Sequence, residues 1–360
     1  MKKTLLLSAV ALFSHALLAA NTPTKLVLLA PLGKAQLYTA QEQAAVFQNL
    51  KNVSAVVSGS SLKVPVELAL LVPHNYDNAF FDPMSAMMIS PYQIKINGST
   101  KHPNFSRVIE MHEYGHALFD ENFEYILGNN RDLIRAFAAF RTVRSKIKSS
   151  MRLVRQGMIE TELIGELLKT TNGDETSLPY KDAMSIVSMT QNENARIESL
   201  VSNDESVLKF GMQLYSIVTA YNEFFADVLA VIISQNPNAI AEAITLTKNN
   251  IDFSDRGFRV RISQRAHSPE VHNFYTLSRE FIYKHYLSDP VIRAKGKSWI
   301  LVKTLQSISC ALDNEAQVEA ILKDAFNKLP SSRRTTWPMF ELEGKNQSFN
   351  NCIEAAFEAR

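Results

Sequence analysis

The strongest constraint on the fold of this chain of 360 residues is a helical pattern that carries two histidines, His112 and His116. In residues 104–119, apolar residues recur at helical spacing after possible N-caps at Asn104 or Ser106. Residues four apart share one face of a helix. The sequence therefore predicts a helix whose two imidazoles can reach the same metal ion.

The neighbouring residues suit a catalytic zinc site, which takes three protein ligands and keeps a fourth position for water. Glu113 lies about 100° around the helix from His112 and can lean over that open position as a general base. A second apolar helical segment, residues 220–229, offers Glu223 as the third ligand. Asp227 lies four residues further on, on the same helix face, and can hold a ligand imidazole from behind.

These two motifs, HExxH at residues 112–116 and NExxAD at residues 222–227, resemble the thermolysin-like zinc metallopeptidases, the gluzincins. The resemblance implies Zn²⁺ as the cofactor and a peptide or protein as the substrate. Hydrolysis would use zinc-activated water, with Glu113 as general base and Glu223 as the glutamate ligand. Thermolysin itself has only a short connection between the two motifs, so a helical insertion is expected at about residues 130–210.

Two further segments carry the same resemblance. Asn78 and Ala79 look like the family's edge strand, which hydrogen-bonds the substrate backbone. His267 lies in a segment similar to the one where the family keeps an oxyanion-stabilising histidine, and the resemblance makes it a second catalytic residue. His272 remains a rival for this task. Three other residues stay open as alternatives to His267: Tyr221, Arg261 and Tyr275.

The region ahead of the histidine helix is rich in strand formers. The strand candidates are residues 25–32, 62–72, 87–90 and 92–96. The sequence therefore predicts an α+β fold with a small mixed β-sheet lobe at residues 21–105. A larger, mainly helical catalytic lobe follows at residues 106–360, with the zinc cleft between the two.

Charge is sharply divided within the expected insertion. Residues 131–155 hold eight Lys or Arg against one Asp, whereas residues 159–206 hold ten acidic residues against three basic ones. We expect the two segments to pair as an antiparallel helical hairpin. The alternative is that the basic helix docks on an anionic surface such as a membrane or a cell-wall polymer.

The first 20 residues have the features of a secretory signal peptide, with two lysines, a short apolar run and small residues that favour cleavage near Ala19 or Ala20. An uncleaved anchor is disfavoured because the run is shorter than the about 20 residues that span a bilayer. No later segment is expected to cross a membrane. The protein is thus expected to be exported, with Cys310 and Cys352 oxidised to a disulfide.

Charge and composition narrow the remaining function classes. Cleavage of the leader removes two of the 38 basic residues, leaving 36 against 36 acidic ones, and nothing points to nucleic acid. The sequence carries no signal for an oligomeric state. One alternative is an exported zinc-binding protein without turnover, against which Glu113 argues because a purely structural site has no use for it. Another is a surface-binding protein whose HExxH is accidental, which predicts no stoichiometric zinc.

Overall fold

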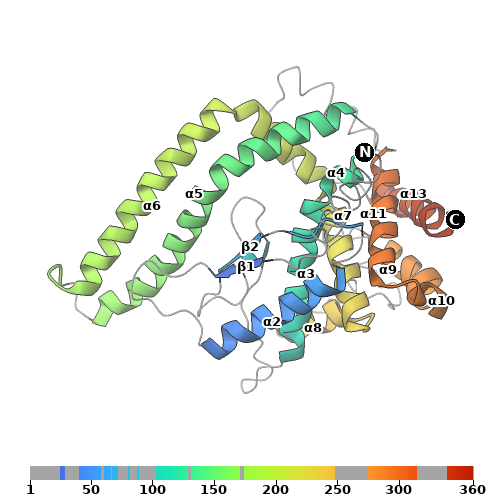
Figure 1. Ribbon diagram of the computed structural model, residues 1–360, viewed down its shortest axis with the longest axis horizontal. Helices are drawn as coiled ribbons and strands as arrows, with labels where there is room; N and C mark the ends of the chain where they lie inside the picture. Colours follow the sequence, from blue (N-terminus) through green and yellow to red (C-terminus); the bar gives the residue numbers. More distant parts are fainter. Residues whose placement is uncertain are drawn as a thin grey trace, which may run out of the picture.

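The computed structural model shows a mainly helical protein (Figure 1). It describes residues 25–28, 40–57, 61–65, 67–71, 80–81, 87–88, 103–128, 131–170, 174–247, 275–313 and 339–359. These residues are 87% helical, and their strands are only two to five residues long. The predicted α+β fold with an N-terminal β-sheet lobe is therefore wrong. A short apolar run does not by itself distinguish a strand from other buried structure, and here helices supply most of the core.

In place of that lobe, the described residues contain a small four-stranded sheet. Its strands are β1 (Lys25–Leu28), β2 (Glu67–Leu71), β3 (Phe80–Phe81) and β4 (Met87–Met88), in the order β1-β2-β4-β3. The first three in this order are parallel neighbours, whereas β3 is antiparallel to β4. β3 thus lies at the edge of the sheet, where it contacts helix α3 (Pro103–Glu121).

Helix α3 packs along helix α7 (Glu205–Ser234) at the centre of the molecule. α3 begins at Pro103, just ahead of the expected cap at Asn104, which suits a residue that lacks an N–H. Around this pair lie α2 (Ala40–Val57), the short α4 (Phe123–Ile126), α8 (Ala239–Thr247) and α11 (Lys297–Asp313). All four contact α3, α7 or both.

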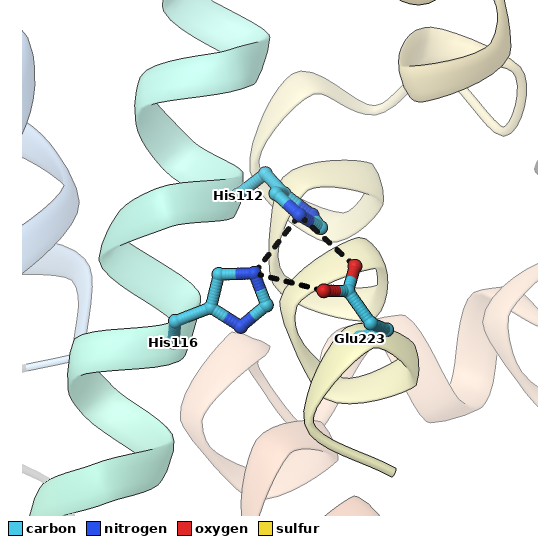
Figure 2. Close-up of side chains that lie close together, drawn as sticks. All are labelled: His112, His116 and Glu223. Carbon is cyan, nitrogen blue, oxygen red and sulfur yellow. Dashed lines mark hydrogen bonds and ion pairs between the residues drawn. The ribbon is translucent and has the colours of Figure 1, made fainter. Parts of the chain in front are cut away.

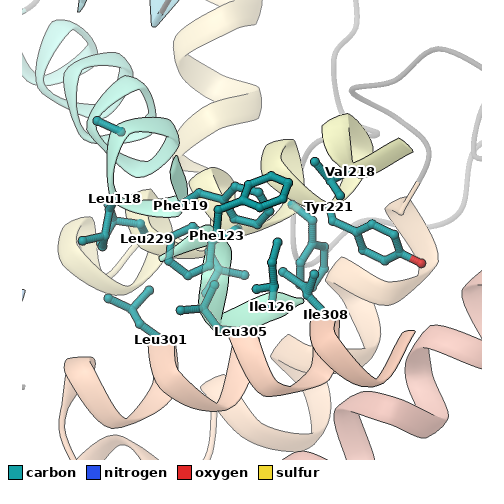
Figure 3. Close-up of a cluster of buried hydrophobic side chains, with 14 of the residues drawn as sticks. Leu118, Phe119, Phe123, Ile126, Val218, Tyr221, Leu229, Leu301, Leu305 and Ile308 are labelled. Carbon is teal, nitrogen blue, oxygen red and sulfur yellow. The ribbon is translucent and has the colours of Figure 1, made fainter. Parts of the chain in front are cut away.

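The core between these helices is aliphatic and aromatic (Figure 3). Phe119 of α3 lies with its ring centroid 5.9 Å from that of Phe123 and 5.7 Å from that of Phe225 on α7. Leu301 and Leu305 of α11 are fully buried against the same cluster. Burial of side chains of this size stabilises a protein by about 1.5–3 kcal/mol each.

The expected insertion forms a long pair of helices, α5 (Arg131–Thr170) and α6 (Leu178–Asn203), which run side by side as a hairpin (Figure 1). The predicted pairing of the two helices is confirmed, but Arg141 of α5 has its ion-pair partners outside α6. Arg141 lies 3.3 Å from Glu121 at the end of α3 and 3.4 Å from Glu124 on α4. Arg141 is therefore paired with acidic residues at the end of the histidine helix and on α4, outside α6.

A buried cluster joins α5 to α3 and α7. Both terminal nitrogens of Arg144 donate to the carboxylate of Asp120, at 2.7 and 2.8 Å, and Nη1 also contacts the hydroxyl of Tyr215 at 2.6 Å. The Tyr215 hydroxyl in turn bonds Asp120. Because arginine and carboxylate are both nearly buried, removal of either partner would leave an uncompensated charge in the core.

The C-terminal part adds α9 (Thr276–Ile282), the π-helix η2 (Tyr283–Leu287), α10 (Pro290–Ala294) and α13 (Met339–Glu358). A disulfide joins Cys310 on α11 to Cys352 on α13, as predicted, with the Cα atoms 5.7 Å apart. The two cysteines are 42 residues apart, so the bridge stabilises the fold by about 4 kcal/mol through restriction of the unfolded chain.

One helix among the described residues has the length and composition of a membrane span, at Ile217–Ser234 within α7. The expectation that no segment beyond the leader is apolar enough to cross a membrane is therefore wrong. However, 67% of that window is buried inside the protein, and it carries the acidic residues Glu223 and Asp227. Its apolar composition follows from its place in the core.

Candidate metal site

Helices α3 and α7 bring together three side chains that could hold a metal ion, His112, His116 and Glu223 (Figure 2). One potential ligand atom from each lies within 4.8 Å of the others. All three side chains are buried, with exposed fractions of 7%, 8% and 9%. Spacing of four residues aligns the histidines on α3, and the packing of α7 against that face supplies the glutamate.

The distances between these atoms match the edges of a coordination polyhedron. His112 Nε2 lies 3.0 Å from His116 Nε2. Glu223 Oε2 lies 3.4 Å from His112 Nε2, and Glu223 Oε1 lies 3.6 Å from His116 Nε2. Tetrahedral coordination with bonds of about 2.0–2.1 Å separates neighbouring ligand atoms by about 3.4 Å. The three side chains therefore fit a small tetrahedral cation.

The second ring nitrogen of each imidazole, Nδ1, faces a side-chain oxygen. His116 Nδ1 lies 2.9 Å from the side-chain oxygen of Asn222, and His112 Nδ1 lies 2.9 Å from a carboxylate oxygen of Asp227. Acceptors at these positions favour the ring protons on Nδ1, so each Nε2 presents a lone pair. In that tautomer the two Nε2 lone pairs, 3.0 Å apart beside a carboxylate, form an arrangement that a bound cation would stabilise.

Asp227 is itself held by a residue that sequence reasoning missed. Arg279 of α9 donates to Asp227 Oδ2 through Nε at 2.9 Å, with Nη2 at 2.8 Å, and both side chains are fully buried. The guanidinium holds one carboxylate oxygen of Asp227 and leaves the other facing His112. The sequence shows Arg279 only as one arginine in a helical pattern, 52 residues from its partner, so no local signal identifies it.

Asn222 was part of the second motif but had no predicted role. The structure places its side chain on His116 Nδ1, which makes it the counterpart of Asp227 on the other histidine. Asn222 directly precedes Glu223, and Asp227 lies four residues after Glu223. The NExxAD pattern thus places a candidate metal ligand and the partners of both imidazoles on one helix.

Glu113 follows His112 on α3 and is 7% exposed.

Helix α3 is also held in place by contacts with α2 and α7. Glu110 accepts a hydrogen bond from the side-chain amide of Asn49 on α2. Gly115 lets α7 approach closely, because an added Cβ there would lie 2.7 Å from Cα of Ala226.

Several predicted site residues lie outside the described residues: Asn78, Ala79, His267, and the alternatives His272 and Arg261. The strand that directly follows Ala79 is β3, which does lie at the sheet edge beside α3. Tyr221 and Tyr275, the other two alternatives, are 3% and 2% exposed and stack on each other at 4.7 Å. Their rings are therefore used in core packing.

Comparison of the chain with models of known protein families, with curated proteins and with solved structures gave no match. The functional argument thus rests on the site itself. Nitrogen and oxygen ligands of this kind suit several divalent transition metals, zinc among them.

Proposed function

We propose that the protein is an exported, zinc-dependent metallopeptidase. The observation that supports this most strongly is the convergence of two imidazole lone pairs and one carboxylate at 3.0–3.6 Å, with a further buried glutamate, Glu113, next to the first histidine. A purely structural zinc site usually closes all four positions with protein ligands. Here three protein ligands and a neighbouring carboxylate are the set that a hydrolytic site needs.

His112, His116 and Glu223 would hold Zn²⁺, with Asp227 and Asn222 fixing the ring orientation of the two histidines. Bound zinc supplies a water whose pKa is lowered to about 7 and polarises the carbonyl under attack.

Glu113 is the proton carrier in this proposal. It takes a proton from the attacking water and passes it to the amine that leaves, which is general base followed by general acid catalysis. Its position directly after His112 on α3, in a buried environment, supports this role. His267 remains the proposed residue that stabilises the oxyanion.

The position of β3 at the edge of the sheet supports the proposal that the substrate is an extended peptide. β3 is paired with β4 on one side, and it contacts the helix that carries the histidines. A peptide added antiparallel or parallel to such an edge would run along the site, held by backbone hydrogen bonds. Asn78 and Ala79, immediately before β3, are the proposed binding residues.

Export is supported by the signal-like N-terminus and by the disulfide between Cys310 and Cys352. Disulfides that join two elements of a folded protein persist mainly in oxidising compartments.

The test compares metal content and peptide hydrolysis in four proteins: wild type, Glu113→Gln, Glu223→Ala and the control Glu205→Ala. Zinc content is measured by elemental analysis after dialysis, and hydrolysis is measured on a mixed peptide library by mass spectrometry. Glu205 is an exposed glutamate at the start of α7 and lies far from Glu223 along the same helix. It therefore controls for loss of a helix carboxylate.

We expect Glu113→Gln to keep stoichiometric zinc and lose hydrolysis, and Glu223→Ala to lose most of the zinc. The control should keep both. A wild-type protein that binds zinc but cleaves no peptide would support a binding role without turnover. A wild-type protein that binds no divalent metal at all would overturn the proposal.

A further inference from the structure

Helix α13 is packed against the back of the metal site through one buried aromatic residue. Phe349 is fully buried, and its ring centroid lies 4.9 Å from that of Phe224, 5.2 Å from that of Tyr221 and 4.7 Å from that of Tyr275. Tyr221 and Phe224 flank the ligand Glu223 on α7. Phe349 therefore fixes the turn of α7 from which the glutamate projects.

The same helix holds α9 through a buried amide. Asn346 accepts a hydrogen bond from the backbone N–H of Ser278 at 3.1 Å, and the Ser278 hydroxyl lies 3.1 Å from the same amide oxygen. The next residue of α9 is Arg279, which holds Asp227, and Asp227 contacts His112. Buried polar contacts, joined through the backbone between Ser278 and Arg279, thus connect α13 to the imidazole of His112.

The disulfide fixes α13 in the position that these contacts require. Cys352 lies one helical turn after Phe349 and is 3% exposed, while its partner Cys310 on α11 is partly exposed. α13 packs mainly on α11 and on α9. Loss of the bridge would leave the placement of Asn346 and Phe349 to non-covalent packing alone.

We propose that α13 is a positioning element of the metal site, and that the Cys310–Cys352 bridge makes metal affinity depend on the redox state of the protein. This inference rests on the metal centre of the proposed function. In the redox step a phosphine transfers two electrons to the disulfide; the S–S bond breaks, two thiols form with protons from water, and the phosphine becomes its oxide. Cys310 is the more exposed of the two cysteines.

The first experiment titrates Co²⁺ into the full-length protein and follows the visible absorption of the complex, which reports both affinity and coordination geometry. The oxidised protein is compared with protein that has been reduced by a phosphine and then desalted without oxygen. A double variant, Cys310→Ala with Cys352→Ala, tests whether new thiols bind the metal themselves. We expect the reduced protein and the double variant to bind Co²⁺ about 10–100-fold more weakly, the range seen when groups that orient metal ligands are lost.

The second experiment keeps the disulfide and changes the contact. Asn346→Ala removes the acceptor for Ser278, whereas Gln347→Ala alters the exposed neighbouring residue on α13. We expect Asn346→Ala to weaken Co²⁺ binding at least about 10-fold and to change the absorption spectrum, with Gln347→Ala equal to wild type. Far-UV circular dichroism establishes that each protein is folded under the titration conditions.

The outcomes separate this inference from the function on which it rests. Equal Co²⁺ affinity and spectra in oxidised, reduced and Asn346→Ala protein would overturn the positioning role of α13 and leave the metal site intact. If the oxidised wild type binds no Co²⁺, the proposed function fails first. If reduction unfolds the protein, the Asn346→Ala comparison decides, because that variant keeps the bridge.

Discussion

Gly115 is where the two ligand-bearing helices meet with no room for another atom. A Cβ at this position would lie 2.7 Å from the backbone Cα of Ala226 and 3.0 Å from its Cβ. We expect Gly115→Ala to destabilise the protein and to weaken metal binding, although alanine is the better helix former by about 1 kcal/mol.

The size of the effect follows from the clash. Carbon atoms pack at about 3.5–4.0 Å, so α3 and α7 have to separate by about 1 Å. Overpacking costs about 1–3 kcal/mol, and a clash with backbone lies near the upper end because no flexible side chain can move aside. Subtraction of the helix-propensity gain leaves a net loss of about 2 kcal/mol in the free energy of unfolding.

Metal binding should suffer from the same displacement. The histidine nitrogens are on α3 and the carboxylate on α7, at 3.4 and 3.6 Å. Metal–ligand distances tolerate only about 0.2 Å of change. A separation of the helices by about 1 Å should therefore lower metal affinity at least about 10-fold.

The assay pairs denaturant unfolding with Co²⁺ titration, and Gly165→Ala on α5 is the matched control. An added Cβ at Gly165 meets no atom within 4 Å, so the control should gain about 0.5–1 kcal/mol and bind metal as wild type does. If Gly115→Ala were as stable as wild type and bound metal equally well, the close helix contact would not be what sets the ligand distances.

Three further predictions concern charge. Arg144→Met should cost about 3–5 kcal/mol in the free energy of unfolding, measured by chemical denaturation, because it leaves the buried Asp120 without the guanidinium that pairs with it. Burial, and then the nearby Glu358 carboxylate, raises the pKa of Tyr286 from 10.0 to about 12. The tyrosine therefore stabilises the fold below pH 10 and loses that contribution as the pH rises to about 12. In Tyr286→Phe, the free energy of unfolding should decline less between pH 10 and about 12 than in wild type. An equal decline in the two proteins would refute the assignment. Burial, and then nearby arginines, lowers the pKa of Lys148 below 10.5, so Lys148→Met should raise the melting temperature at pH 7, with a gain that disappears as the pH approaches 10.5.

The sequence by itself identified the three residues of the candidate metal site, His112, His116 and Glu223. His112 and His116 share a helix face because a spacing of four is nearly one turn, and Glu223 and Asp227 do the same on α7. This periodicity is a local property of the helix, so it can be recognised without knowledge of the fold. With two cysteines in the chain, pairing of Cys310 with Cys352 was the sole intramolecular disulfide available.

The tertiary structure decided how these local patterns are combined. The small sheet and the dominance of helices depend on which apolar surfaces pack together, and a short apolar run carries no information about its partner. Asn222 and Arg279 became partners of His116 and Asp227 only when three helices met. Contacts between distant segments arise from packing, whose geometry is not written in the spacing of residues along any one helix.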